Sequence, residues 1–337
     1  MSSSAHELST IPFVTPCSNK CAKNIVTYND LPHMVDNYVI LEKLGYGGFG
    51  FVCKVMDVNT QIYYAMKIVS STSSYKRELF MLEKVQQSYF AYDMKRYITT
   101  YVNASESGNI RYTIFPLLAC TVFDYVKNKK LELPELKRIS LQIVKGLHFL
   151  HSNGIIHGDI KLENVMLEEV NTSSTSDIKL IDLGLAHSVE ENTNHDVSTL
   201  NYRAPEMMLD QGFDTSSDIW SVGCALFSLW TGKCLFVGDT EKEVISMISH
   251  VIGPAPQEYQ SHKIFDEEFL KHSKKLNIRR SRTKSLQDKV FRFRGPYTYE
   301  TLDEESLFVD LLQRMLVWNP AHRITAEEAM DHMLFHI

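Results

Sequence analysis

The chain has 337 residues, of which 44% are hydrophobic and 23% charged, as is ordinary for a globular protein with room for two lobes or domains. A net charge of −6 argues against a general nucleic-acid binder, and no apolar run approaches the roughly 20 residues that a membrane-spanning helix needs. The N-terminus lacks the pattern of a secretory signal, and six scattered cysteines without a Cys-x-x-Cys pair indicate reduced thiols. We therefore expect an intracellular monomer, in the nucleus, the cytoplasm or both, that binds neither membranes nor nucleic acid directly.

Residues 1–36 mix Ser, Thr, Pro and Asn without a sustained period, which predicts a flexible arm. Beyond them, short apolar runs bounded by polar turns predict a lobe of antiparallel strands with one main helix over residues 37–118. The expected strands cover 39–41, 51–55, 62–69, 97–102 and 110–118, with a polar turn at 105–109 between the last two, and the expected helix covers 74–87.

Helical periodicity dominates residues 119–337. The expected helices cover 136–150, where Pro134 suits the start, and 216–230, 240–251 and 307–316. Between the last two, residues 253–301 are polar and irregular, and their basic run from Lys274 to Lys284 is either a solvated insert or, less favoured, a nuclear-localisation patch. This order predicts an α+β fold with a small β-rich lobe before a larger, mostly helical one.

A glycine-rich segment, Gly45-Tyr46-Gly47-Gly48-Phe49-Gly50, lies between two expected strands. Dinucleotide-binding folds use the same spacing, but there the glycines open a helix; a purely structural turn is a further alternative. Because a strand follows here, the segment is better explained as a hairpin whose backbone N–H groups approach phosphates.

Lys67 lies in an apolar strand, where an unpaired ammonium would be costly. Glu78 on the helix that follows is the candidate partner, although exposure at the surface is the ordinary explanation for a strand lysine.

Four further polar residues stand at intervals that favour phosphoryl transfer. Asp159 could accept a proton and Lys161 could neutralise a phosphoryl group. Asn164 and, eighteen residues later, Asp182 could supply the oxygen ligands that Mg²⁺ prefers. A solvated loop would explain one of these residues but not the set.

Taken together, residues 45–52, 64–67, 157–164, 182–184, 204–206 and 218–220 resemble the signature motifs of eukaryotic protein kinases, in the same order and at similar intervals. Tyr202-Arg203-Ala204-Pro205-Glu206 and the insert at about 253–301 resemble the CMGC group of kinases. Residues 149–153, 197–203 and 251–256 are most similar to the CDC-like (LAMMER) kinases within it. The resemblance implies the bilobal kinase fold, with residues 37–118 as the N-lobe and 119–337 as the C-lobe.

The resemblance also implies roles for individual residues. Lys67, held by Glu78, would orient the ATP phosphates, Asp159 would be the catalytic base beside Lys161, and Asn164 and Asp182 would bind Mg²⁺. Glu206 would pair with Arg323 and Asp218 would hold the catalytic-loop backbone, as structural contacts. ATP would be contacted by Leu44, Gly45, Tyr46, Gly47, Gly48, Phe49, Gly50, Phe51, Val52, Ala65, Lys67, Phe115 as gatekeeper, Leu118 in the hinge and Asp124 at the ribose.

Three positions depart from the usual kinase pattern. Gly158 stands where an arginine normally meets an activation-loop phosphate, so activity without such a phosphate is expected. Leu162 replaces a usual proline and Leu183 a usual phenylalanine, and only Met247 of the LAMMER stretch is present. Ser198, Thr199 and Tyr202 are candidate phosphorylation sites whose modification we do not expect to be required.

We expect an active protein kinase that transfers the γ-phosphoryl group of Mg-ATP to serine and threonine hydroxyls, with tyrosine autophosphorylation as a second activity. Its protein substrates are expected to be arginine–serine-rich or basic. The alternatives are a pseudokinase scaffold that binds partners without catalysis, and an active kinase related to the dual-specificity-tyrosine-regulated or SR-protein kinases.

Overall fold

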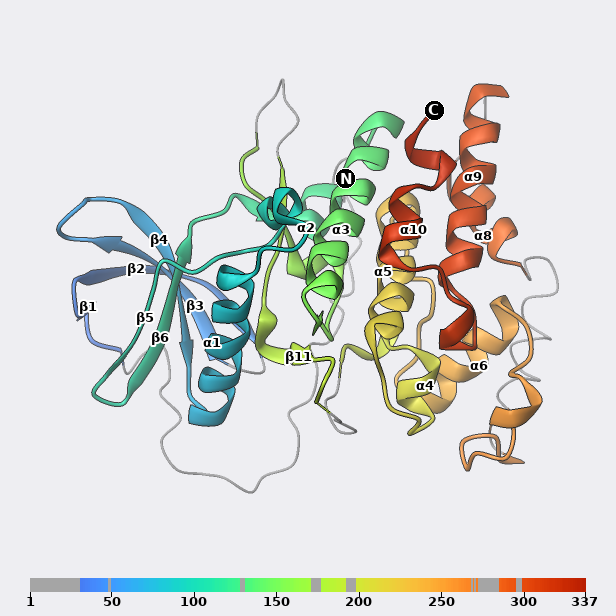
Figure 1. The fold of residues 1–337 in the computed structure, drawn as a ribbon, viewed down its shortest axis with the longest axis horizontal. Coiled ribbons are helices and arrows are strands. Elements are labelled where there is room, and N and C mark those ends of the chain that lie inside the picture. Colours follow the sequence, from blue (N-terminus) through green and yellow to red (C-terminus); the bar gives the residue numbers. More distant parts are fainter. Residues whose placement is uncertain are drawn as a thin grey trace, which may run out of the picture.

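The computed structural model describes residues 31–47, 50–127, 131–170, 177–191, 198–267, 269, 271, 285–294 and 299–337. Most of the expected arm, Gly48, Phe49 and the basic run from Lys274 to Lys284 lie outside these residues. Figure 1 shows a β-rich lobe beside a larger helical one, which confirms the predicted α+β arrangement.

The smaller lobe is built on a six-stranded sheet in the order β1-β2-β3-β4-β6-β5, with antiparallel pairing throughout. Its strands are β1 (Met34–Val35), β2 (Tyr38–Gly47), β3 (Gly50–Asp57), β4 (Tyr63–Val69), β5 (Asn103–Ser107) and β6 (Ile110–Pro116). β1 falls within the expected arm, so the prediction of flexibility is wrong there. Val35 is buried, and the neighbouring Asp36 accepts hydrogen bonds from Tyr112 and Ser107.

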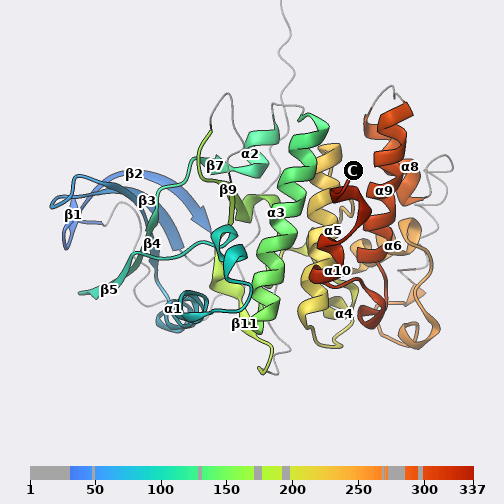
Figure 2. The ribbon, with the colours of Figure 1, turned by 45° about the horizontal axis from the view of Figure 1, so that its top comes forward.

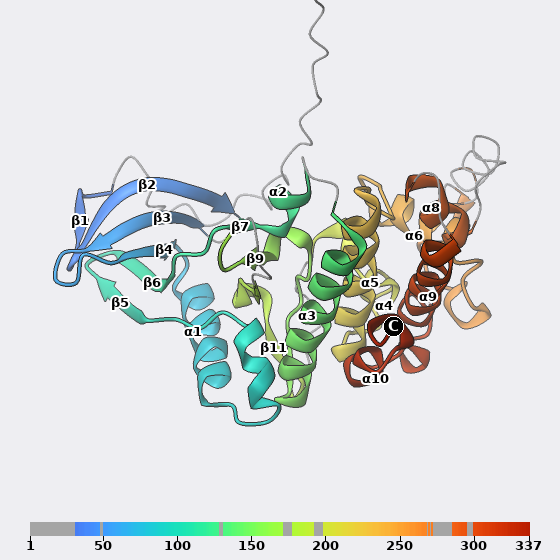
Figure 3. The ribbon, with the colours of Figure 1, turned by 90° about the horizontal axis from the view of Figure 1, so that it is seen from above.

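The helix α1 (Thr72–Gln87) packs against β4 and β6 on one face of this sheet (Figures 1 and 3). It begins where the Oγ of Ser71 accepts a hydrogen bond from the N–H of Ser74, which satisfies one of the free donors of the first turn. Met81, Leu82 and Val85 belong to the same buried cluster as the core of the larger lobe. The helix therefore packs against both lobes.

The expected strand at 97–102 is wrong. A 3-10 helix, Tyr92–Tyr97, occupies its start, and the strand is β5, within and just before the segment predicted as a polar turn. Tyr97 and Ile98, whose side chains suggested the strand, are buried in the core of the larger lobe. β5 is polar because it lies at the edge of the sheet, where side chains face solvent.

Helices make up most of the larger lobe (Figures 1 and 2). They are α2 (Val122–Lys127), α3 (Leu133–Ser152), α4 (Pro205–Met208), α5 (Thr215–Thr231), α6 (Glu241–Val251), α8 (Leu286–Arg294), α9 (Tyr299–Met315) and α10 (Ala326–Met330). Short strands form two small sheets: β7 (Cys120–Thr121), β9 (Val165–Leu167) and β10 (Ile178–Leu180) in one, β8 (Ile155–Ile156) and β11 (His187–Ser188) in the other.

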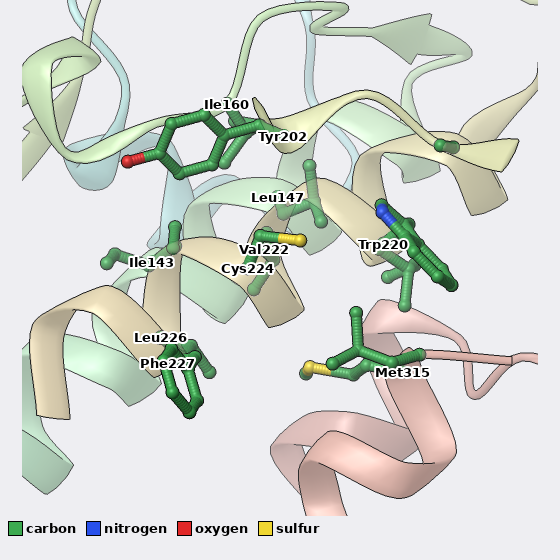
Figure 4. Close-up of a cluster of buried hydrophobic side chains, with 14 of the residues drawn as sticks. Ile143, Leu147, Ile160, Tyr202, Trp220, Val222, Cys224, Leu226, Phe227 and Met315 are labelled. Carbon is green, nitrogen blue, oxygen red and sulfur yellow. The ribbon is translucent and has the colours of Figure 1, made fainter. Parts of the chain in front are cut away.

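The helix α5 is the centre of the large-lobe core, with every residue from Ser217 to Trp230 buried. Figure 4 shows it between Ile143 and Leu147 of α3 on one side and Met315 of α9 on another. Trp230 stacks on Phe308 with 4.0 Å between ring centroids. Asp214 caps the start of α5, and Gly232, in the left-handed conformation at φ +67°, ends the helix. Because α5 is enclosed, residues near its start are held firmly.

None of the helices in the described part of the chain is long and apolar enough to cross a membrane.

Candidate active site

A glycine hairpin joins β2 to β3, with Gly45 opposite Val52 and Gly47 opposite Gly50. Gly50 has φ +153°, and a Cβ there would lie 1.9 Å from the backbone oxygen of Ile68 on β4. By contrast, a Cβ at Gly45 or Gly47 would meet nothing within 4 Å. Gly50 is thus required by the close approach of two strands.

We expect Gly50→Ala to destabilise the protein by about 1–3 kcal/mol, because the backbone must move or accept a strained conformation. Gly45→Ala, in the same hairpin but with open space at the Cβ, is the matched control and should cost much less. Thermal unfolding of both variants measures the difference. Equal unfolding temperatures would contradict the packing at Gly50.

Lys67 on β4 lies between two carboxylates. Its Nζ is 2.6 Å from Oε1 of Glu78 on α1 and 2.7 Å from Oδ1 of Asp182, after β10. β4 carries Lys67 between Val52 of β3 and Thr113 of β6, so the neighbouring strands fix its backbone. The contact between Lys67 and Glu78 that the sequence suggested is present, and Asp182 shares the same ammonium.

The charged states of Lys67, Glu78 and Asp182 depend on one another. Burial alone would favour a neutral lysine, but Asp182 and Glu78 outweigh it and raise the pKa of Lys67. Burial likewise opposes the charge of Asp182, and Lys67 outweighs it, so that the pKa of Asp182 falls to about 2. Both groups are therefore charged at neutral pH. Asp182 also has φ +64° and accepts a hydrogen bond from the N–H of Gly184, which fixes the turn.

The lowered pKa of Asp182 predicts a pH-dependent contribution to stability. The carboxylate stabilises the folded state fully above the ordinary aspartate pKa of 3.8, and this contribution is lost as the pH falls from there toward about 2. The free energy of unfolding of wild type relative to Asp182→Asn should therefore decrease between pH 5 and pH 3 in urea titrations. A difference that stays constant over this range would show that the pKa is not lowered.

A network of hydrogen bonds holds Asp159 in place. Oδ2 accepts from Lys161 Nζ at 2.6 Å and from Asn164 Nδ2 at 3.0 Å. Oδ1 accepts from the hydroxyl and the N–H of Thr199, at 2.7 and 3.1 Å. Lys161 also donates to the Thr199 hydroxyl at 2.8 Å. The carboxylate is thus oriented from both sides, beside a lysine that can stabilise a neighbouring anion.

Asp218, in the first turn of α5, holds the backbone that precedes Asp159. Its two oxygens accept from the N–H groups of His157 and Gly158, at 2.8 and 2.9 Å, and one also contacts His151 Nε2 at 3.0 Å. Gly158 has φ +78°, and a Cβ there would lie 2.6 Å from the backbone oxygen of Leu185. Glycine has no Cβ and tolerates this φ, so glycine in place of the usual arginine fits the local backbone at residue 158.

A second anchor joins Glu206 of α4 to Arg323. The guanidinium and the carboxylate make two parallel hydrogen bonds of 2.6 Å, and both side chains are almost fully buried. Arg203 binds the same region to α6, donating to the carbonyl oxygen of Ser198 and pairing with Glu241 at 2.6 Å. The chain between Asp182 and Glu206 is therefore held at its end by ion pairs.

The other described residues predicted to contact ATP lie on β2, β3, β4, β6, α2 and the link from β6 to β7. Ala65 of β4 lies opposite Phe115 of β6, and Leu118 follows in the link from β6 to β7. Asp124 lies in the first turn of α2, where its Oδ2 accepts from the Thr121 hydroxyl at 2.7 Å. Leu44 and Tyr46 are exposed and Phe51 is buried in the small-lobe core. Their roles remain predictions.

The hydroxyl groups predicted as phosphorylation sites are buried or hydrogen-bonded in this conformation. Ser198 and Tyr202 are buried, and burial raises the pKa of the Tyr202 hydroxyl far above its usual value. Figure 4 shows the Tyr202 ring among the core side chains of α3 and α5. The Thr199 hydroxyl is occupied by Asp159 and Lys161. Modification of these residues would require this segment to open.

The donor set fits magnesium held partly by a substrate. Asp182 offers a carboxylate, and Asn164, whose amide nitrogen donates to Asp159, leaves its amide oxygen for a metal. Mg²⁺ is bound in phosphoryl-transfer sites by one or two protein oxygens together with substrate phosphates. The described residues contain no group of three or more His, Cys, Asp or Glu that could hold a metal ion.

The role of Thr199 as a partner of Asp159 was missed from the sequence, which presented it only as a phosphorylation site. It lies 40 positions from Asp159, and no local spacing relates the two. The contacts of His151 with Asp218 and of Lys67 with Asp182 were missed for the same reason.

Comparison with known proteins agrees with this geometry. Residues 38–335 match the family model described as the protein kinase domain, and the chain therefore belongs to the protein kinase family. Among its relatives is the mouse "Dual specificity protein kinase CLK4", 29% identical over 89% of this chain and 66% of the relative. Human "Dual specificity protein kinase CLK1" is 30% identical over the same shares of the two chains. These similarities confirm the predicted likeness to CDC-like kinases.

A relative from fission yeast is similar to this chain to the same extent. The fission yeast "Dual specificity protein kinase lkh1" is 30% identical over 89% of this chain and 47% of its own length. The chain thus spans about two thirds or less of the length of these relatives.

Proposed function

We propose that the protein is an active serine/threonine kinase that uses Mg-ATP, and that its lobes divide at about residue 118. Lys67, held by Glu78, would orient the nucleotide phosphates, and Asp159 would accept the proton of the substrate hydroxyl. Bound Mg²⁺, held by Asn164 and Asp182, would offset the charge of the phosphates. Lys161 would stabilise the charge that develops on the transferred group.

The observation that carries this proposal is the simultaneous contact of Lys67 with Glu78 and Asp182, 2.6 and 2.7 Å away. It supports the proposal because the residues assigned to phosphate orientation and to metal binding are in contact, while Asp159 is held by Thr199 and Lys161. A scaffold without catalysis needs neither arrangement.

The test is phosphate transfer from Mg-ATP to arginine–serine-rich and to basic proteins by the purified chain. We expect transfer by wild type, none without Mg²⁺, and a loss of at least about a hundredfold in Asp182→Ala. Equal phosphate incorporation by wild type and Asp182→Ala would contradict the proposed activity of this chain. The absence of metal-dependent nucleotide binding would favour a scaffold.

We further propose that the substrates are arginine–serine-rich or basic proteins, with tyrosine autophosphorylation as a second activity. Similarity to relatives named as dual specificity kinases supports the second activity, and the substrate class rests on the resemblance to the CDC-like kinases. A peptide-library profile distinguishes the subfamilies: dependence on arginine agrees with a CDC-like or SR-protein type, and dependence on proline after the target serine would contradict it.

Activity should not depend on phosphorylation of the chain between Asp182 and Glu206. Gly158 provides no side chain to bind a phosphate there, Ser198 and Tyr202 are buried, and the Thr199 hydroxyl is hydrogen-bonded to Asp159. We expect the phosphatase-treated enzyme to keep its initial rate within about twofold, with mass spectrometry as the check on phosphate removal. A loss of activity that Mg-ATP preincubation restores would contradict this prediction.

A further inference from the structure

Lys84, in the last turn of α1, connects three segments that are distant in the sequence. Its Nζ donates to the Oγ of Ser188 in β11 at 2.9 Å and to the carbonyl oxygen of Gly154 at 3.2 Å. Gly154 lies in the turn between α3 and β8. Figures 1 and 2 show α1 next to β11 across the boundary between the lobes.

Both acceptors of Lys84 lie in segments that other contacts hold in place. β11 pairs with β8, with Ser188 opposite Ile155, and the N–H of Val189 donates to the same Gly154 oxygen at 3.0 Å. Ser188 is buried, so its hydroxyl faces the lysine rather than solvent. The ammonium therefore attaches α1 to a fixed part of the larger lobe.

The same helix carries Glu78 six residues before Lys84. A helix of this length is continuously hydrogen-bonded, so that a tilt at one end displaces side chains along it. Glu78 must stay within hydrogen-bonding distance of Lys67, now 2.6 Å, for the lysine to be held in place. An attachment at Lys84 restricts such a tilt.

We propose that Lys84 is a positioning residue, which fastens α1 to Ser188 and Gly154 and thereby keeps Glu78 on Lys67 without a phosphate. The inference rests on the proposed kinase activity and deepens it. Gly158 has no side chain that could make the corresponding attachment through a phosphorylated residue, and the lysine–serine contact supplies one from unmodified side chains.

The test compares full-chain variants. Lys84→Met keeps the aliphatic stem and removes the ammonium, Lys84→Arg restores a charged donor, and Lys76→Met removes an exposed lysine from the same helix as a control. We expect kcat for phosphate transfer to fall about tenfold in Lys84→Met, because a hydrogen bond from a charged group contributes about tenfold or more to an equilibrium. Lys84→Arg should recover much of the rate, and Lys76→Met should match wild type.

Ser188→Ala provides an independent variant should Lys84→Met fail to fold. It should lower kcat by less, since the contact with the Gly154 oxygen remains. Adding it to Lys84→Met should cause no further loss, because Lys84→Met has already removed the contact with Ser188. Additive losses in the double variant would indicate two unrelated structural effects and would overturn the inference.

Hydrogen exchange of the α1 and β11 amides gives a readout that does not require catalysis. Exchange in both elements should be faster in Lys84→Met than in wild type and unchanged in Lys76→Met. If wild type transfers phosphate and Lys84→Met keeps its rate and its exchange, the inference is wrong. If wild type transfers none while exchange still rises in Lys84→Met, the proposed function fails and the link between α1 and β11 is supported.

Discussion

Asp159→Asn is expected to lower kcat for phosphate transfer by about 10²–10⁴-fold, because an amide cannot accept the substrate proton as a carboxylate does. The asparagine keeps one oxygen that can accept hydrogen bonds from Thr199 or Lys161. The loss should therefore arise mainly in the chemical step, with a small change in the KM for ATP. Steady-state kinetics with a fixed protein substrate separate the two parameters.

Asp331→Asn is the control for this measurement, because it makes the same chemical change at an exposed position at the end of α10. It should retain the kinetics of wild type. An Asp159→Asn variant with wild-type kcat would remove Asp159 from the mechanism, whatever its position in the network.

Arg323→Met should have the largest effect on stability, about 3–5 kcal/mol, since it leaves the Glu206 carboxylate buried without its counter-charge. Only the hydroxyl of Ser217, 2.7 Å from Oε1, would remain as a partner among the described side chains. The guanidinium also donates to backbone oxygens at Val317 and Ser216, and these bonds would be lost as well. Urea unfolding followed by tryptophan fluorescence measures the change.

Lys263→Met removes an exposed ion pair with Asp210 and is the matched control. Both side chains there are largely in solvent, 83% and 68% exposed, so the expected cost is about 0–1 kcal/mol. The double variant Glu206→Leu with Arg323→Met should recover part of the loss, because no buried charge is then unpaired. Equal effects of Arg323→Met and Lys263→Met would contradict the burial of the pair.

Local sequence patterns predicted much of the fold. The strands around the glycine hairpin and the helices near 74–87, 136–150, 216–230 and 240–251 follow from apolar periodicity, because each buries one face or all of itself against a neighbour. The expected strand at 97–102 was wrong because periodicity cannot show which lobe an apolar run enters, and β5 was missed because an edge strand can be polar on both faces.

The candidate site was predictable in its members but not in its connections. Asp159, Lys161, Asn164 and Asp182 stand at recognisable intervals, and Lys67 with Glu78 could be paired from the strand and helix that carry them. The contacts of Thr199 with Asp159, of Lys84 with Ser188 and of Lys67 with Asp182 join residues 40, 104 and 115 positions apart. Only the folded chain brings them together.

The pairing of Glu206 with Arg323 also bears on the order of folding during synthesis. The two residues are 117 positions apart, so Arg323 leaves the ribosome roughly 6–23 s after Glu206 at about 5–20 residues per second. Until then the carboxylate has no counter-charge, whereas α9, which covers α5, is made shortly before Arg323. The apolar surface of α5 accordingly stays uncovered on the nascent chain until α9 has been made, and the ion pair can close only after that.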